Sequence, residues 1–311
     1  MYKVAAYITL YKDIDAIEKC LSCLYEQTYP IDKIFIVDNS PKRLDSLVFN
    51  NEKIIIDFHP ENIAIAEGLN IGINWAIENK YDFLWTFDQD SEPNVDTLEI
   101  LLSEYEYLAQ CDIPVGIIAP TIIEIQTQQI LPNAVRKSYR FEPFAPTPSL
   151  FHYYREKLYQ CDVVITSGSL INLQSAKQIP LPNPDFFIDG VDMDYCLKIG
   201  QHGYHVCVTQ KAFMKHNFGT YLTTIWKKTP IYIYSSLRYY YINRNHTYIE
   251  TRLSSKPIDI ILSFIHRLTI LIKNIVKIIL FEPDQKPLKI WASCLGFTHG
   301  LIGKLGKTWL P

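Results

Sequence analysis

Short apolar runs alternate with longer amphipathic stretches over residues 1–120, and this order constrains the fold more than any other feature of the chain. The runs that predict strands are Val4–Leu10, Ile34–Val37, Ile54–Phe58, Phe83–Phe87 and Val115–Ala119. The stretches that predict helices are Ile14–Glu26, Ala64–Glu78 and Val95–Leu108. Such alternation is typical of βαβ units around a largely parallel sheet, so we expect an α/β fold.

Two carboxylates follow the apolar run Phe83–Phe87, at Asp88 and Asp90. Ligands of open α/β sheets bind at the carboxyl ends of the strands, and hard divalent cations prefer oxygen ligands. The position therefore predicts a site for a metal and a diphosphate. A solvated acidic turn is the alternative, and the Ser91-Glu92-Pro93 that follows would suit one.

The charge of the chain is divided unevenly. Residues 1–210 hold 15 basic and 29 acidic side chains, whereas residues 211–311 hold 15 basic and 4 acidic ones. An apolar content of 48% and 20% charged residues indicate a globular protein. An acidic body with a basic tail suggests that the tail faces phosphates, nucleic acid or a membrane surface.

The pattern changes in the middle of the chain and again after Pro230. Residues 130–160 are rich in proline and aromatic residues, which predicts a loop over the site or a linker. A helix is expected over Val191–Gly200, and strands over His205–Val208 and Ala212–Lys215 are expected to complete the sheet. Helices are expected from Pro230 onward.

The stretch Ile258–Phe281 is long enough to cross a bilayer, but it carries a polar stripe at helical spacing. The stripe consists of Asp259, Ser263, His266, Arg267, Lys273, Asn274 and Lys277. Several charges at bilayer depth would be costly, whereas a helix with a basic stripe and a broad apolar face suits the membrane interface. The alternative is a helix that packs its apolar face on the rest of the protein.

The N-terminal residues and the cysteines indicate a cytoplasmic protein. Met1–Leu10 lacks the long apolar region and the small-residue cleavage site of a signal peptide. The seven cysteines are scattered and odd in number, so they predict no disulfide framework and fit a reducing compartment.

An ordered set of motifs along nearly the whole chain resembles the family 2 glycosyltransferases, and among them the bacterial rhamnosyltransferases. The motifs are Thr9-Leu10-Tyr11, Val37-Asp38-Asn39-Ser40, Asn62 to Ile73, Asp88-Gln89-Asp90-Ser91, Thr166-Ser167-Gly168-Ser169, Phe187 to Asp194, His216-Asn217-Phe218-Gly219, Arg238 to Asn245 and Gly300 to Lys307. The resemblance implies the A-type glycosyltransferase (GT-A) fold, a Rossmann-like mixed sheet flanked by helices, with a helical C-terminal appendage. We expect a nucleotide-sugar-binding catalytic domain over residues 1–225 and a basic, membrane-associated helical region over 226–311. One departure is Ala64, where the family often has glycine.

Residues at the expected ligand edge of the sheet are candidates for nucleotide binding. Thr9, Tyr11 and Asp38 lie at strand ends, where an aromatic ring can stack on a base and a carboxylate can accept its N–H. The resemblance assigns them to the nucleotide, although each is also an ordinary turn residue. The turn and helix-start residues Asn62, Gly68 and Asn70 are candidates to bring backbone N–H groups close to a phosphate.

The resemblance divides the metal site among three residues. Asp90 is the better metal ligand, Asp88 lies near the ribose or a metal-bound water, and His216 meets the metal or the diphosphate. The implied metal is Mg²⁺ or Mn²⁺, which neutralises charge on the leaving diphosphate.

The resemblance also places the catalytic base in the acidic cluster before and within the helix Val191–Gly200. Asp192 is the preferred base and Asp189 the reserve, while Asp194 supports the loop. Carboxylates at a helix start also have the simpler role of stabilising the helix.

Two further sets of residues flank this cluster. Ser167 and Gly168 are expected to shape the donor-sugar or acceptor pocket. Arg238, Arg244 and Asn245 are expected to meet phosphates of the donor or of a lipid-linked acceptor, or else to lie on a solvated helix face.

The expected activity is therefore an inverting, metal-dependent transfer of a sugar, with dTDP-L-rhamnose as the donor implied by resemblance. The expected acceptor is a lipid-linked saccharide in surface polysaccharide synthesis. The protein is expected to be peripheral at the inner face of the plasma membrane, with an anionic membrane surface and no nucleic acid as partner. A metal-dependent nucleotidyltransferase and a non-catalytic membrane-associated scaffold are the alternatives.

Overall fold

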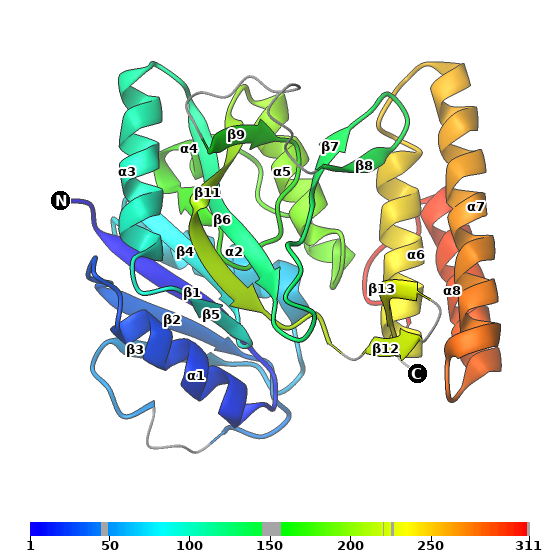
Figure 1. The fold of residues 1–311 in the computed structure, drawn as a ribbon, viewed down its shortest axis with the longest axis horizontal. Helices are drawn as coiled ribbons and strands as arrows, with labels where there is room; N and C mark the ends of the chain where they lie inside the picture. Colours follow the sequence, from blue (N-terminus) through cyan, green and yellow to red (C-terminus); the bar gives the residue numbers. More distant parts are fainter. Residues whose placement is uncertain (45–48, 145–156, 220, 225–226, 310–311) are drawn as a thin grey trace. The chain divides into compact units, whose positions relative to one another are not determined.

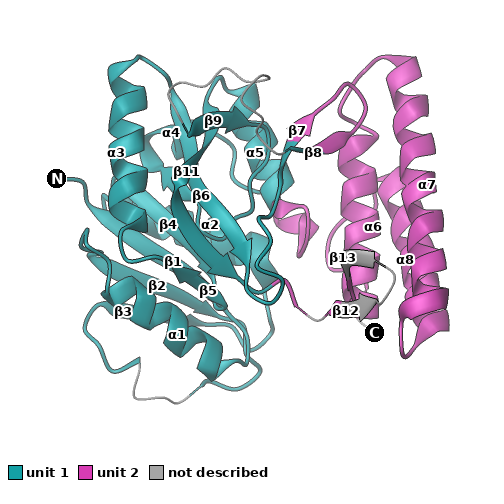
Figure 2. Cartoon of the chain, viewed as in Figure 1, with its two compact units in different colours: residues 1–134, 143–182, 192–217 teal, residues 135–142, 183–191, 218–311 magenta. Residues whose placement is uncertain are grey.

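The structure is a computed structural model that describes residues 1–44, 49–144, 157–219, 221–224 and 227–309 (Figure 1). The chain divides into two compact units (Figure 2). The sheet unit contains residues 1–134, 143–182 and 192–217, and the helical unit contains residues 135–142, 183–191 and 218–311. The division after residue 217 follows the last strand of the large sheet, and two internal segments belong to the helical unit.

A nine-stranded sheet forms the centre of the sheet unit. Its strands are β1 (Val4–Leu10), β2 (Lys33–Asp38), β3 (Ile54–Phe58), β4 (Phe83–Asp88), β5 (Ser91–Pro93), β6 (Val115–Glu124), β9 (Leu158–Cys161), β10 (Leu170–Asn172) and β11 (His205–His216). The order is β3-β2-β1-β4-β10-β6-β11-β5, with β9 beside β11. Strands β1 to β4 are parallel, whereas β10, β5 and β9 run antiparallel to their neighbours, so the sheet is mixed as the GT-A fold requires.

Helices cover both faces of this sheet, which explains why its central strands are almost continuously apolar. They are α1 (Ile14–Tyr25), α2 (Ala64–Glu78), α3 (Thr97–Gln110), α4 (Leu173–Ala176) and α5 (Val191–Gln201). On one face Trp75 of α2 stacks on Phe35 of β2, with ring centroids 4.6 Å apart. On the other face Tyr105 of α3 meets the edge of Phe83 of β4 at 4.8 Å.

Helix α2 lies unusually close to β1 because two glycines leave room for Tyr7. A Cβ on Gly72 would lie 2.4 Å from the Tyr7 ring, and one on Gly68 would lie 2.7 Å from its hydroxyl oxygen. Gly68 is therefore required for packing inside a helix, which differs from the phosphate-loop role expected of it.

Most elements of the sheet unit match the expectation, and two regions differ. Strands Val4–Leu10 and Ile54–Phe58 and helix Ala64–Glu78 have the predicted bounds. The two strands expected over residues 205–215 are one strand, β11, with a register irregularity after Thr209.

The prediction of a loop over residues 130–160 is wrong in part. This segment contains the paired strands β7 (Asn133–Arg136) and β8 (Phe141–Phe144) and the start of β9. Pro143 is tolerated in β8 because this two-stranded sheet leaves one side of each strand without a ladder. Residues 145–156, with Pro146 and Pro148, lie outside the described part of the chain.

Three long helices form most of the helical unit: α6 (Ser236–Glu250), α7 (Pro257–Phe281) and α8 (Lys286–Ile302). The 3-10 turn η2 (Pro184–Phe186) and strands β12 (Tyr221–Thr224) and β13 (Lys227–Tyr232) complete it. Helices α6 and α8 touch backbone to backbone, because a Cβ on Gly296 would lie 2.2 Å from the Tyr240 carbonyl oxygen. A Cβ on Gly300 would lie 2.4 Å from the carbonyl oxygen of Arg244.

The expectation that α7 packs its apolar face on the rest of the protein is wrong, whereas the membrane-interface expectation stays a prediction. The polar residues Asp259, Ser263 and Arg267 of α7 are buried, whereas most of its isoleucines are exposed. The apolar face is therefore not the face that packs on the protein, and most of the polar stripe does not face outward. Among the described residues, no helix is both long and apolar enough to span a membrane.

Candidate active site

Three predicted metal-site residues converge at one edge of the sheet. Asp88 is the last residue of β4, and Asp90 follows it directly. His216 ends β11 and is brought to this place because β11 pairs with β5 in a register that sets His216 opposite Ser91. The His216 Nδ1 atom lies 3.4 Å from Asp90 Oδ1, and its Nε2 atom lies 3.9 Å from Asp88 Oδ2.

The electrostatics of this cluster favour a cation. Burial raises the pKa of Asp90 to about 6, the nearby His216 lowers it, and the neighbouring Asp88 raises it further. Two carboxylates held this close repel each other unless positive charge lies between or beside them. Oxygen and imidazole ligands are those that Mg²⁺ and Mn²⁺ accept in proteins. Within the described ranges, however, no set of three or more Asp, Glu, His or Cys side chains is arranged as a complete metal cage.

The loop Thr166–Ser169 fixes the position of Asp88. The Ser167 hydroxyl donates to Asp88 Oδ2 at 2.8 Å and accepts from the Asp88 backbone N–H at 2.8 Å. Gly168 has a φ of 85°, a conformation that favours glycine, and its N–H donates to the Thr86 carbonyl at 2.7 Å. Ser167 and Gly168 therefore lie beside the carboxylate cluster.

The predicted nucleotide residues Thr9, Tyr11 and Asp38 lie at the same edge of the sheet. Thr9 is paired with Asp88 in the ladder between β1 and β4, and Leu10 with Asp38 in the ladder between β1 and β2. The ring of Tyr11 is exposed, and its backbone is held by both polar atoms of the Gln89 side chain. Gln89 lies between the two carboxylates, so its place in the motif could have indicated this role.

The start of α2 contains two residues in the left-handed region. Asn62 has a φ of 54° and Ala64 a φ of 62°, and the Asn62 side chain accepts from the Ala64 N–H at 2.9 Å. A glycine at position 64 would adopt this conformation without strain, which gives a physical reason for the family's preference. The sequence did not single out Asn39 as a site residue. Its side chain accepts from the Ile63 N–H at 2.9 Å and joins this turn to the end of β2.

Asn70 lies away from this edge. It is buried within α2, and its amide donates to the Pro182 carbonyl at 2.9 Å. Its contacts are those of a residue that holds a loop on the helix.

The acidic cluster before and within α5 separates into three environments. Asp192 lies in the first turn of α5 and accepts from the Met193 N–H at 3.1 Å. It lines a small recess of the sheet unit with Thr86, Thr166, Ser169 and the buried Tyr195. Asp194 forms an ion pair with Lys198 at 2.7 Å. Asp189 belongs to the helical unit and has its Oδ1 atom 3.4 Å from Nε of Arg238.

Arg244 and Asn245 of α6 are buried and hold the segment that leads into α5. The Arg244 guanidinium donates to the carbonyls of Asp185 at 2.8 Å and Phe186 at 3.1 Å, and also to that of Gly306. The Asn245 amide donates to the carbonyls of Phe186, Ile188 and Asp189. Arg244 was predicted to meet a phosphate, but its guanidinium donates to backbone carbonyls and to the side chains of Asn245 and Thr308.

Comparison with known proteins identifies the class. The glycosyl transferase family 2 model matches residues 6–177, more than half of the chain, and the chain belongs to this family. The dTDP-rhamnosyl transferase RfbF of Shigella flexneri is 24% identical over 243 residues, which cover 75% of this chain and 77% of that protein.

Solved structures share the fold at low identity. A crystal structure of S. aureus TarS aligns over 93% of this chain with a TM-score of 0.56 and 12% identity. A crystal structure of GalNAc-T7 with UDP, GalNAc and Mn²⁺ aligns over 98% with a TM-score of 0.58 and 12% identity. The chain spans about half the length of these two proteins, 48% and 56% respectively. The chain is thus a glycosyltransferase with a GT-A fold, and membership of this family decides against a nucleotidyltransferase.

Proposed function

We propose that this protein transfers L-rhamnose from dTDP-L-rhamnose to a saccharide acceptor, with inversion at the anomeric carbon and with a divalent cation. The observation that carries the proposal is the convergence of Asp88, Asp90 and His216 at the sheet edge that also holds Thr9 and Asp38. The similarity to a dTDP-rhamnosyl transferase supports the choice of sugar and nucleotide.

The cation would be Mg²⁺ or Mn²⁺, held by Asp90 with Asp88 and His216 beside it. A site at which the protein supplies only some of the ligands suits a cation that a diphosphate would also coordinate. Once bound, the cation would neutralise charge that develops on the departing diphosphate. Ser167 contributes by orienting Asp88, and the exposed ring of Tyr11 is available to the base.

Asp192 is the proposed general base. Its carboxylate would accept the proton of the acceptor hydroxyl while the hydroxyl oxygen forms a bond to the anomeric carbon. The bond from that carbon to the diphosphate oxygen breaks with its electron pair, so dTDP leaves with the negative charge. Asp192 is preferred within the cluster because it belongs to the sheet unit, which also holds Asp88 and Asp90, and lines a recess there with Thr86, whereas Asp189 belongs to the helical unit.

The proposed acceptor is lipid-linked, in surface polysaccharide synthesis at the inner face of the plasma membrane. The strongly basic region after residue 210 and the apolar surface of the helical unit support a working place beside an anionic membrane.

A panel of nucleotide sugars tests the proposal. Each donor is incubated with the purified protein and Mn²⁺, and release of the nucleoside diphosphate is measured with and without a rhamnose-accepting saccharide. We expect dTDP-L-rhamnose to be consumed fastest. Consumption of another donor alone would overturn the assignment of the sugar, and consumption of none would favour the non-catalytic scaffold.

A further inference from the structure

One side of α7 exposes a continuous row of apolar side chains. The row, called here the outer face, consists of Ile258, Ile261, Ile265, Leu268, Ile272, Val276 and Ile279. Each is between 36% and 59% exposed, although solvated helices normally turn such residues inward. The 25 residues of α7 span about 37 Å, so the outer face is a continuous apolar surface and not a few isolated exposed residues.

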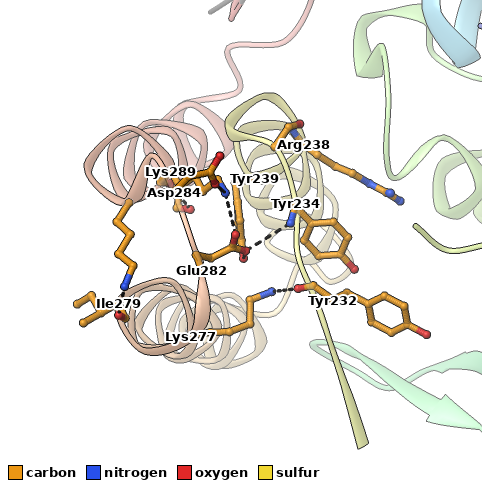
Figure 3. Close-up of polar contacts among 12 residues, drawn as sticks. Tyr232, Tyr234, Arg238, Tyr239, Lys277, Ile279, Glu282, Asp284 and Lys289 are labelled. Atoms are coloured by element: carbon orange, nitrogen blue, oxygen red, sulfur yellow. Dashed lines mark hydrogen bonds and ion pairs between the residues drawn. The ribbon is translucent and has the colours of Figure 1, made fainter. Parts of the chain in front are cut away.

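The polar side of the same helix is turned into the helical unit. Arg267 is buried and lies 3.5 Å from Glu250 of α6. Lys277 donates to the Tyr232 carbonyl at 2.9 Å, and its ammonium also lies over the rings of Tyr234 and Tyr239 (Figure 3). The polar contacts therefore fix which side of α7 faces outward.

The turn between α7 and α8 strengthens this orientation. Glu282 is buried, accepts from the Tyr239 hydroxyl at 2.7 Å and forms an ion pair with Lys289 at 2.7 Å (Figure 3). Because removing one partner of a buried pair is costly, rotating α7 to bury its isoleucines would be opposed in the middle of the helix and at its C-terminal end.

In the described part of the chain after residue 217, the exposed charge is almost entirely positive. Three of the four acidic residues after residue 217 are buried, namely Glu250, Asp259 and Glu282, and Asp284 is exposed. Among the residues after 217 whose exposure is described, the exposed basic side chains are Arg252, Lys256, Lys273, Lys304 and Lys307. Of these, Lys273 lies on α7 and Lys256 is its N-cap. A surface with apolar side chains and positive charge is complementary to anionic lipid.

We propose that α7 lies in the plane of the membrane interface with its outer face inserted among the lipids. This inference rests on the proposed function, because it gives a lipid-linked acceptor a surface at which to meet the enzyme. In this proposal, insertion of apolar side chains supplies most of the affinity for the membrane, and not the basic stripe that was expected to do so. The exposed lysines add a smaller attraction that depends on salt.

A second copy of the chain fits the outer face less well than lipid. A coiled-coil seam is narrow and is flanked by charged residues that pair across it. Here the flanking residues Ile260, Phe264 and Leu280 are also exposed and apolar, and Lys273 is the one charged residue among the exposed positions of α7, which is described in full.

Flotation of the full-length protein with lipid vesicles tests the proposal. The vesicles contain phosphatidylethanolamine and phosphatidylglycerol, and the variant carries Ile265→Gln together with Ile272→Gln. Full burial of an isoleucine is worth enough to change partitioning about 10-fold, so we expect the double variant to bind roughly 100-fold more weakly. Thr269→Gln is the matched control, because Thr269 is exposed on the same helix between these two positions, and it should float like the wild type.

Three results would overturn the proposal: no flotation of the wild type, equal flotation of the double variant, or a wild-type dimer in light scattering that the double variant converts to a monomer. The substituted positions are exposed, so equal melting temperatures are expected for all three proteins. Transfer to a water-soluble acceptor, measured on the same preparations, should be equal as well. Its absence in every preparation would be a failure of the proposed function, separate from the vesicle result.

Discussion

In the sheet unit the apolar strands are buried and the carboxylates Asp88 and Asp90 stand at the sheet edge, whereas the helical unit buries Glu250 and Glu282 and exposes the isoleucines of α7. Burial of apolar side chains drives folding in water, so the first arrangement is the ordinary one. The second is stable because its buried charges are paired and because backbone-close packing of α6 on α8 supplies other contacts. The difference teaches that polar residues form the proposed reaction site in one unit and hold the architecture in the other.

The largest effect is expected from a carboxylate of the sheet unit. Asp192→Asn keeps the size of the side chain but removes its basicity, so turnover should fall by roughly 10²–10⁴-fold. Donor affinity, measured by calorimetry, should hardly change. The matched variant is Asp189→Asn, which alters a carboxylate that contacts Arg238 in the helical unit. If Asp189→Asn alone shows the loss of turnover with intact donor affinity, the base has been assigned to the wrong residue.

The next effect concerns a buried cation of the helical unit. Arg244→Met removes one hydrogen bond from each of the carbonyls of Asp185, Phe186 and Gly306, so the free energy of unfolding should fall by about 3 kcal/mol. Arg244→Lys keeps the charge but not the planar fork, and it should recover only part of the loss. Urea denaturation measures both. A large loss of donor affinity with unchanged stability would instead make Arg244 a phosphate ligand.

The site in the sheet unit was more predictable than the helical unit. The carboxyl ends of parallel strands meet at one edge, so Thr9, Asp38 and Asp88 could be grouped from strand positions alone. The burial of Arg244 could not be predicted from the sequence, because the carbonyls that accept from its guanidinium come from segments distant in the chain. The periodicity of α7 predicted two faces, but which face turns inward depends on partners such as Glu250 that periodicity does not reveal.

A pH-dependent effect of at most similar size is expected from the buried Glu250. Burial raises the pKa of Glu250 to about 7, while Arg267 and Arg140 lower it by less. The folded state then holds a proton that the unfolded state releases near pH 4.5, so Glu250 costs stability as the pH rises from about 4.5 to about 7. The cost should approach roughly 3 kcal/mol at higher pH.

The Glu250→Gln variant should lack this pH dependence. The free energy of unfolding, measured by urea denaturation at several pH values, should decline more steeply for the wild type than for the variant across that window. Parallel curves would show that Glu250 titrates normally, and the buried pair with Arg267 would then be fully ionised.

The smallest effect returns to the sheet unit. Ala64→Gly removes left-handed strain at a φ of 62° and should stabilise the protein by about 0.5–1 kcal/mol. The control Ala66→Gly places glycine inside the same helix and should destabilise by about 1 kcal/mol. Thermal melting compares the two, and a loss of stability in both would contradict the strain assigned to Ala64.

The central claim is that the carboxylate edge of the sheet unit binds a nucleotide sugar through a divalent cation. Calorimetric titration of dTDP-L-rhamnose tests it most directly, with Mn²⁺ or with EDTA, in the wild type and in Asp90→Asn. The account predicts binding by the wild type with Mn²⁺, and a large loss both with EDTA and in the variant. Equal affinity in EDTA and Mn²⁺ would contradict it.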